Sequence, residues 1–219
     1  MGLGITCSGL RREFAGVAVV DDVTFQAPAG RVTAVVGPNG AGKTTLLLML
    51  AGQLRPHQGY IRVGQTDPAV EPWVVRSQVG WVPDVYESSE TWSIAEVLHY
   101  SASIAGHNGG RSAELVERAL DLARLRKYSA EPVLHLSRST KKWLSLARAL
   151  VSDPAVLVLD NPMADLDDEG RGYLSELLRD FARQNMTIVV SALATDGLAG
   201  CAQESVHLDH GRVVGSRGL

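Results

Sequence analysis

Short runs of apolar, β-branched residues recur along this chain and predict a protein rich in strands. Residues 5–25 alternate between apolar and polar positions around a turn at Ala15-Gly16, which predicts two paired strands. The continuous apolar run at 155–159 is typical of a central parallel strand covered on both faces. Further strands are predicted at 32–36, 59–63, 79–82, 187–191, 205–209 and 212–214.

Helix-like patterns occupy much of the rest, and they are predicted over 46–51, 71–78, 112–125, 140–152 and 168–184. Ser93 and Glu96 form a capping-box pattern, which predicts the start of another helix that runs to about residue 103. We therefore expect an α/β fold whose core comprises residues 1–83 and 153–219, with a mostly parallel sheet and an N-terminal antiparallel β part. Residues 84–152 are expected to form a helical subdomain inserted into that core.

A glycine-rich segment, Gly-Pro-Asn-Gly-Ala-Gly-Lys-Thr-Thr, joins the strand at 32–36 to a helix that starts near Gly42. Its pattern, G-x-x-x-x-G-K-[ST], is that of a phosphate-binding loop, in which backbone N–H groups and a helix N-terminus surround a phosphate. We expect Lys43 to reach the β- and γ-phosphates and the Thr44 hydroxyl to hold Mg²⁺. A plain glycine-rich turn is the alternative, but the complete motif between a strand and a helix favours nucleotide binding. The loop residues expected to bind ATP are Gly37, Asn39, Gly40, Ala41, Gly42, Lys43, Thr44 and Thr45.

A carboxylate, Asp160, ends the strand predicted at 155–159. In phosphate-loop enzymes an Asp at the end of such a strand helps to hold Mg²⁺. A helix cap is the alternative role for Asp160, but the presence of a complete phosphate-loop motif favours the metal-binding role. Asn161 follows directly, where a hydrolytic site needs a proton acceptor. An amide can orient water but cannot take its proton.

Composition narrows the function classes. The chain has 219 residues and a formal net charge of −3 without a long basic run, so we expect no nucleic-acid partner. No apolar run approaches the length of a membrane span, and no secretory signal is visible. The two cysteines, Cys7 and Cys201, are far apart in sequence, which fits a reduced cytosolic interior.

Taken together, these segments resemble the nucleotide-binding domain of the ABC transporter family over practically the whole chain. The phosphate loop matches without departure, residues 136–150 read as the family's LSGGQ segment and its helix, and 156–162 read as its Asp-Glu-Pro strand end. Residues 164–167 resemble its D-loop. Phe14 lies where the family places an aromatic residue that stacks on the adenine. The alternative is that Phe14 is a half-buried aromatic residue of a strand. The resemblance implies a P-loop NTPase core that takes ATP and Mg²⁺.

Several family positions carry other residues here. Asp84 replaces a Gln of the Q-loop, which places a carboxylate there and makes it a further candidate metal ligand. The catalytic Glu is Asn161, and the switch His is Leu193. The family's LSGGQ segment contacts the phosphate of a second domain, and the corresponding residues here are Ser137, Arg138 and Ser139. The resemblance therefore carries over nucleotide binding, but no intact catalytic residue.

The function expected from this resemblance is that of an ATP-binding subunit of an ABC transporter, with weak hydrolysis or none. Its partners would be transmembrane transporter subunits and a second nucleotide-binding domain, in a homodimer or a heterodimer. Its place would be cytoplasmic, peripheral on the inner face of the cell membrane through those subunits. A catalytically active transport ATPase and a soluble ATP-dependent regulatory protein of the same fold are the alternatives. Trp81, Tyr86 and Trp92 are expected either to dock a membrane subunit or to be structural, with Trp81 in the core and the other two packing the subdomain.

Overall fold

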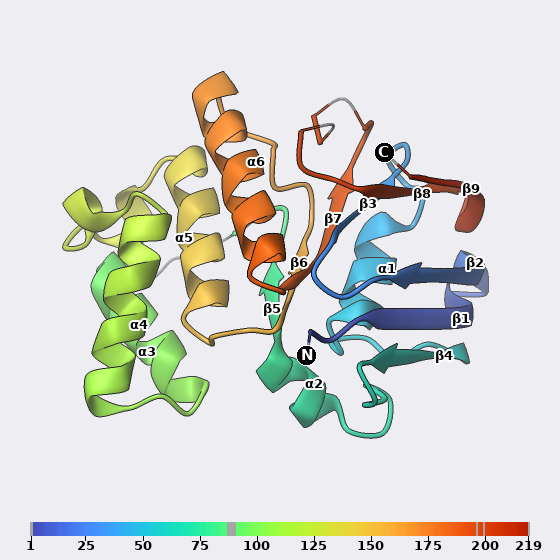
Figure 1. The fold of residues 1–219 in the computed structure, drawn as a ribbon, viewed down its shortest axis with the longest axis horizontal. Coiled ribbons are helices and arrows are strands. Elements are labelled where there is room, and N and C mark those ends of the chain that lie inside the picture. Colours follow the sequence, from blue (N-terminus) through green and yellow to red (C-terminus); the bar gives the residue numbers. More distant parts are fainter. Residues whose placement is uncertain (1, 87–90, 196, 199, 219) are drawn as a thin grey trace.

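The computed structural model describes residues 2–86, 91–195, 197–198 and 200–218. Its strands form two sheets (Figure 1). The smaller sheet is antiparallel, with the order β2-β1-β4. Its strands are β1 (Ile5–Phe14), β2 (Val17–Ala27) and β4 (Gln58–Val63). The predicted turn at Ala15-Gly16 is confirmed, because both of its residues have positive φ angles between β1 and β2.

The larger sheet has the order β5-β6-β7-β3-β8-β9. Its first five strands are parallel, and β9 runs antiparallel to β8. The strands are β3 (Val32–Val36), β5 (Val79–Val82), β6 (Val156–Leu159), β7 (Thr187–Ala192), β8 (Glu204–Asp209) and β9 (Arg212–Gly218). The predicted fold class, a mostly parallel sheet with an antiparallel N-terminal part, is confirmed.

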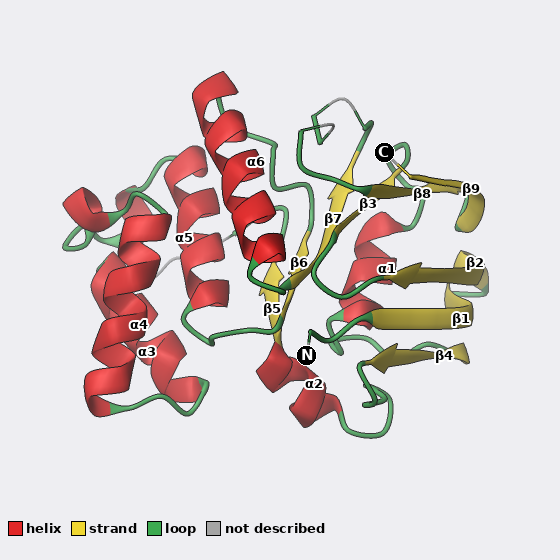
Figure 2. Ribbon diagram, in the orientation of Figure 1, coloured by secondary structure: helices red, strands yellow, loops and turns green. Residues whose placement is uncertain are grey.

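Helices cover both faces of the larger sheet, and Figure 2 shows most of them gathered on one side of the strands. They are α1 (Lys43–Leu50), α2 (Pro72–Gln78), α3 (Ile94–Ile104), α4 (Gly109–Leu122), α5 (Arg138–Leu150) and α6 (Asp168–Arg183). Two 3₁₀ turns, Arg126–Tyr128 and Val133–His135, lie between α4 and α5. Among the described residues, none of the helices is long and apolar enough to cross a bilayer.

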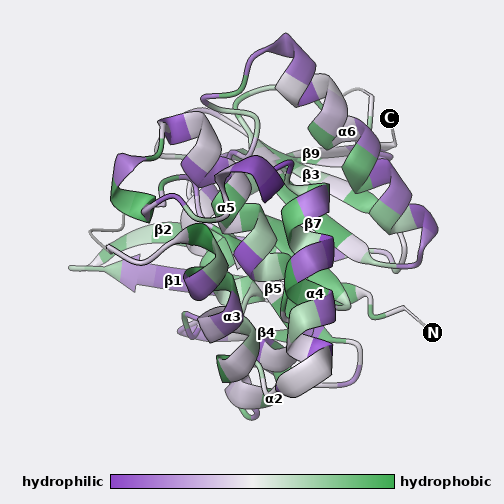
Figure 3. Cartoon of the chain, turned by 90° about the vertical axis from the view of Figure 1, so that its left-hand side faces the viewer, coloured by the Kyte–Doolittle hydropathy of each residue, from purple (hydrophilic) through white to green (hydrophobic). Residues whose placement is uncertain are grey.

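Two apolar cores follow from the alternation of side chains along the parallel strands. Leu157 and Leu159 of β6 point into a core shared with α3, α4, α5 and α6. Val156 and Val158 point to the other face, into a core that α1 shares with the smaller sheet. Hydrophilic and hydrophobic residues accordingly alternate around α4 and α6 (Figure 3). Burial on both faces explains why β6 reads as an unbroken apolar run.

The helix starts vary in how well the sequence predicts them. The capping box that opens α3 is confirmed: Ser93 Oγ accepts from the Glu96 N–H, and Glu96 Oε2 accepts from the Ser93 N–H. Helices α4 and α5 begin earlier than predicted. The side chain of Ser137 accepts from the Thr140 N–H at 3.1 Å, so α5 begins directly after this N-cap. The division into a core and an inserted subdomain of residues 84–152 stays a prediction.

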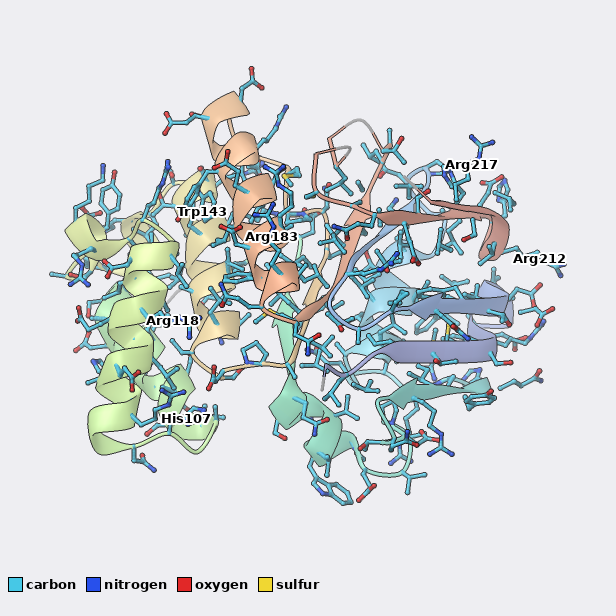
Figure 4. The ribbon with its side chains drawn as sticks, viewed as in Figure 1. His107, Arg118, Trp143, Arg183, Arg212 and Arg217 are labelled. Carbon is cyan, nitrogen blue, oxygen red and sulfur yellow. The ribbon has the colours of Figure 1, made fainter. Side chains whose placement is uncertain are left out.

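An ion pair joins the two sheets at one edge. Arg212, labelled at the tip of β9 in Figure 4, donates from Nε to Asp21 Oδ2 of β2 at 2.9 Å. Arg11 of β1 also pairs with Asp21. These hydrogen bonds and charges, Arg212 first, lower the pKa of Asp21.

Candidate functional site

Four neighbouring parallel strands bring the predicted site residues together. Gly37 follows β3, Asp84 lies beyond β5, Asp160 follows β6, and Leu193 follows β7. Because these strands are adjacent and parallel, their carboxyl ends meet at one edge of the sheet. That edge is where ligands bind in open α/β sheets.

Glycine is required at two positions of the phosphate loop by close backbone approach. A Cβ on Gly37 would lie 2.0 Å from the Leu208 carbonyl oxygen, and one on Gly42 would lie 2.3 Å from that of Val19. Gly42 also has a φ of 96°, which side chains rarely adopt. The loop is therefore held in one shape by the strands behind it, and α1 begins at the next residue.

The Lys43 ammonium is folded back into the loop. Its Nζ donates to the carbonyl oxygens of Gly37 at 2.7 Å and Pro38 at 2.8 Å. Burial lowers the pKa of Lys43, while the carboxylates of Asp160 and Asp84 oppose that change. The Lys43 ammonium is therefore hydrogen-bonded to two carbonyl groups of the loop, and the two acidic side chains are close enough to influence its charge.

Thr44 and Asp160, the two candidate metal ligands favoured by the sequence, are in contact. The Thr44 hydroxyl donates to Asp160 Oδ2 at 2.6 Å. The other oxygen of this carboxylate accepts from the Ser191 hydroxyl, and Asp160 is only 3 % exposed. In the described part of the chain, no group of three or more His, Cys, Asp or Glu side chains could hold a metal by itself. A hydroxyl and a carboxylate fit Mg²⁺, which takes one or two protein oxygens together with phosphate oxygens.

Asn161 is held by hydrogen bonds from its main chain and its side chain. Its N–H donates to Ser191 Oγ at 2.9 Å, and its side-chain Nδ2 donates to Asp84 Oδ1 at 3.2 Å. Its φ of 46° is left-handed, a conformation that Asn tolerates better than most residues. The residue that the family resemblance assigns to the catalytic Glu position is therefore an amide, and it is hydrogen-bonded to the residue assigned to the Q-loop Gln position.

Sequence reasoning missed Lys142, which lies in α5 and contacts both of these residues. Its Nζ donates to Asp84 Oδ1 at 3.2 Å, to the Asp84 carbonyl, and to the Asn161 carbonyl at 3.3 Å. Lys142 is only 6 % exposed. One signal was available: Lys142 lies four residues before Leu146, so it shares the apolar face of an amphipathic helix.

A cavity of about 220 Å³ opens at this edge of the sheet. It is lined by Val19, Asn39, Gly40, Gly42, Lys43, Thr44, Thr45, Asp84, Asp160, Asn161 and Leu193. Gly37 and Ala41 belong to the loop but do not line this cavity. The structure thus places most of the predicted loop residues, both carboxylates, and Asn161 and Leu193, which the resemblance assigns to catalytic positions, around one cavity.

Phe14 and the LSGGQ-like residues do not line the cavity. Phe14 ends β1 with 45 % of its surface exposed, and the Arg12 guanidinium lies 4.9 Å from its ring centre. At the start of α5, Ser137 is the N-cap, while the Arg138 side chain is 89 % exposed and 4.0 Å from Asp165. Ser139, next in α5, is also outside the cavity lining. Their predicted roles, towards the adenine and towards a second domain, stay predictions.

The three aromatic residues in and after β5 differ in their surroundings. Trp81 is partly buried against the core next to α1, so the packing interpretation fits it. Tyr86 packs against the helical core, and the Arg148 guanidinium lies 4.8 Å from its ring centre. Trp92 is exposed and meets Tyr100 edge to face at 5.2 Å. Of the three, Trp92 is thus the most available for contact with a partner.

Comparison with known proteins identifies relatives in one family. The family model described as "ABC transporter" matches residues 20–164. The chain is 31 % identical over 211 residues to the Nod factor export ATP-binding protein I of Ralstonia nicotianae, covering 96 % of this chain and 65 % of that protein. It is 32 % identical over 199 residues to the probable multidrug ABC transporter ATP-binding protein YbhF of Escherichia coli, covering 90 % and 34 %. The chain therefore spans about two thirds of the first relative and one third of the second.

Solved structures share the fold at lower identity. An ATP-binding subunit of an ABC transporter superposes with a TM-score of 0.90 at 24 % identity, covering 98 % of this chain and 90 % of that one. A dimeric ATP-binding cassette bound to ADP and Pi gives 0.89 at 18 %, covering 98 % of each. The family match covers more than half of the chain, and it includes the phosphate loop and Asp160. This chain belongs to the ABC transporter family and has the fold of its nucleotide-binding domains.

Proposed function

We propose that this chain binds ATP with Mg²⁺ as the ATP-binding subunit of an ABC transporter, and that it couples this binding to a membrane partner. The observation that carries the proposal is the Thr44–Asp160 contact of 2.6 Å, which joins the phosphate loop to the end of β6 inside the cavity. Thr44 and Asp160 would hold the cation, with Asp84 as a further ligand on the same cavity wall. When bound, Mg²⁺ would offset the negative charge of the phosphate oxygens.

Nucleotide binding uses groups that the loop already presents. The backbone N–H groups before α1 and the helix N-terminus offer donors to a phosphate. Lys43 would exchange its bonds to the Gly37 and Pro38 carbonyls for phosphate oxygens. Burial disfavours the charged form of Lys43 and lowers its pKa, and an entering phosphate would supply an anionic partner that stabilises the ammonium.

Hydrolysis is proposed to be weak or absent. Asn161 lacks a group that can accept the proton of an attacking water, and losing a general base typically costs about 10²–10⁴-fold in rate. Leu193 lines the cavity with an apolar side chain that is 58 % exposed. Losing a polar group that stabilises transition-state charge costs about 10²–10³-fold, and such losses are not additive.

The partners proposed are a transmembrane transporter subunit and a second nucleotide-binding domain. The names of the relatives support the first, since they are ATP-binding proteins of export and multidrug transport. The dimeric cassette supports the second. The chain would then sit on the inner face of the membrane through these subunits. Co-purification with membrane subunits from its own cells would test this.

The test of nucleotide binding is calorimetric titration of the purified chain with ATP and Mg²⁺. We expect saturable binding by the parent and none measurable for Lys43→Ala. Lys127→Ala, which removes an exposed lysine from the 3₁₀ turn after α4, is the matched control and should bind like the parent. A Lys43→Ala variant that binds ATP as tightly as the parent would refute the phosphate-loop role.

A further inference from the structure

The buried ammonium of Lys142 connects two segments, each of which contributes a residue to the lining of the nucleotide cavity. It donates to Asp84, which lies beyond β5, and to the carbonyl of Asn161, which follows β6. A buried cation is costly unless it is paired and hydrogen-bonded. Here the Asp84 carboxylate, with its side chain 44 % exposed, is its partner at 3.2 Å.

Asp84 and Asn161 are tied to each other as well as to Lys142. The Asn161 amide donates to the Asp84 oxygen that also accepts from Lys142. The side chain of Asn161 is therefore turned towards Asp84, and its main chain is fixed by Ser191 and Lys142. Three residues from three elements form one hydrogen-bonded unit, and two of them line the cavity.

We propose that Lys142 is a positioning residue of the nucleotide site, which holds the Asp84 carboxylate against the Asn161 amide and balances its charge. This inference rests on the nucleotide-binding function proposed above. Asp84 faces the same cavity as Lys43 and Thr44, so its charge acts on any phosphate there. Without the ammonium, Asp84 would repel metal-free ATP, while Mg²⁺ would offset much of that repulsion.

The test compares ATP affinity with and without the cation. Lys142→Met keeps an unbranched side chain in the buried position but removes its charge. We expect its dissociation constant for ATP in EDTA to rise about tenfold over that of the parent, because an uncompensated carboxylate faces the phosphates. With Mg²⁺ the rise should be about threefold or less, so the ratio of the two constants increases.

Three further variants separate positioning from packing. Lys141→Met removes the neighbouring, partly exposed lysine and should leave the ratio unchanged. Lys142→Arg keeps a cation and should restore the ratio in part. Asp84→Asn added to Lys142→Met removes the repelling charge, so metal-free affinity should recover despite the second substitution.

The same pair can be tested without nucleotide by thermal unfolding. Asp84→Asn leaves a buried ammonium beside a neutral amide, whereas Lys142→Met leaves a carboxylate that water can reach. Asp84→Asn should therefore lower the melting temperature more than Lys142→Met does, and the double variant should recover part of the loss. The reverse order would contradict the assignment of Lys142 as the buried partner.

Each outcome of the titration decides between the two proposals. Equal weakening of ATP binding with and without Mg²⁺ would show that Lys142 only supports the fold, and it would overturn this inference alone. A parent chain that binds ATP no better than Lys43→Ala would overturn the proposed function, and this inference with it.

Discussion

Phe14 shows how a single residue can be read in two ways from the sequence. As a half-buried strand aromatic it would stabilise the small sheet, and as a stacking residue it would bind the adenine. The structure leaves 45 % of it exposed at the end of β1, next to the turn at Ala15-Gly16. An exposed ring with one face near Arg12 is available to a planar ligand.

We therefore expect Phe14→Ala to weaken ATP binding by about 1–3 kcal/mol, the cost of losing a base stacked on an aromatic side chain. Calorimetry measures this directly. Tyr60→Ala, which removes an exposed aromatic of β4 in the same sheet, should leave affinity unchanged. An unaltered dissociation constant for Phe14→Ala would return this ring to a purely structural role.

The residues of the phosphate loop could be predicted because their chemistry is encoded locally. Glycines, Lys43 and Thr44 are contiguous in sequence, and their spacing alone specifies a loop before a helix. Lys142 could not be found in this way. Its burial arises only because α5 packs against the segments that follow β5 and β6, which are far apart in sequence. A lysine in a helix usually faces solvent, so its place on the apolar face of α5 was only a weak signal of burial.

At the scale of elements, most strands were predicted more closely than helix ends, although β9 continues to Gly218, beyond the predicted end at residue 214. The strands are short apolar runs bounded by turn residues, so their limits are visible. Helix α4 ends where Arg124 adopts a left-handed φ of 55°. Glycine or asparagine is the usual signal for such an end, so an arginine there gives no warning in the sequence.

The ion pair between Arg212 of β9 and Asp21 of β2 makes the junction of the two sheets sensitive to acid. Arg212 and Arg11 lower the pKa of Asp21 in the folded state. An unfolded Asp has a pKa of about 3.9, so the folded state binds this proton less readily. The stabilisation is therefore complete above that value, and it is lost as the pH falls through the lower, folded pKa.

We expect Asp21→Asn to be less stable than the parent in urea unfolding at pH 7, and the difference to shrink below about pH 4. High salt should also reduce the difference, because the Arg212 side chain is 67 % exposed and that of Arg11 is 35 % exposed. Asp22→Asn, at the next position of β2, serves as the control. A difference that persists or grows on acidification would show that the Asp21 ion pairs do not stabilise the junction.

At the scale of the whole molecule, the order of the parallel strands places the candidate site residues at one edge of the larger sheet. The predicted elements indicated a parallel sheet, but they did not give the order β5-β6-β7-β3 that places Asp84, Asp160, Leu193 and Gly37 together. Strand order depends on contacts between distant segments, and a single sequence shows these only through resemblance to a family. The same arrangement brings Asn161 and Leu193 to the cavity wall, so we expect turnover to depend on both residues together.

We expect the purified chain to hold ATP in a long-lived complex, with phosphate release close to that of Lys43→Ala. Asn161→Glu alone should restore little, because it places a second carboxylate beside Asp84 and removes the hydrogen bond that the Asn161 side chain donates to Asp84. Like charges at that distance repel. Adding Leu193→His should help more than either change alone, since it supplies a polar group at the other substituted wall of the cavity. The measurement is phosphate release at saturating ATP and Mg²⁺. Turnover by the parent at about 1 s⁻¹ or faster, within the ordinary enzyme range, would show that this site hydrolyses ATP without a carboxylate at residue 161.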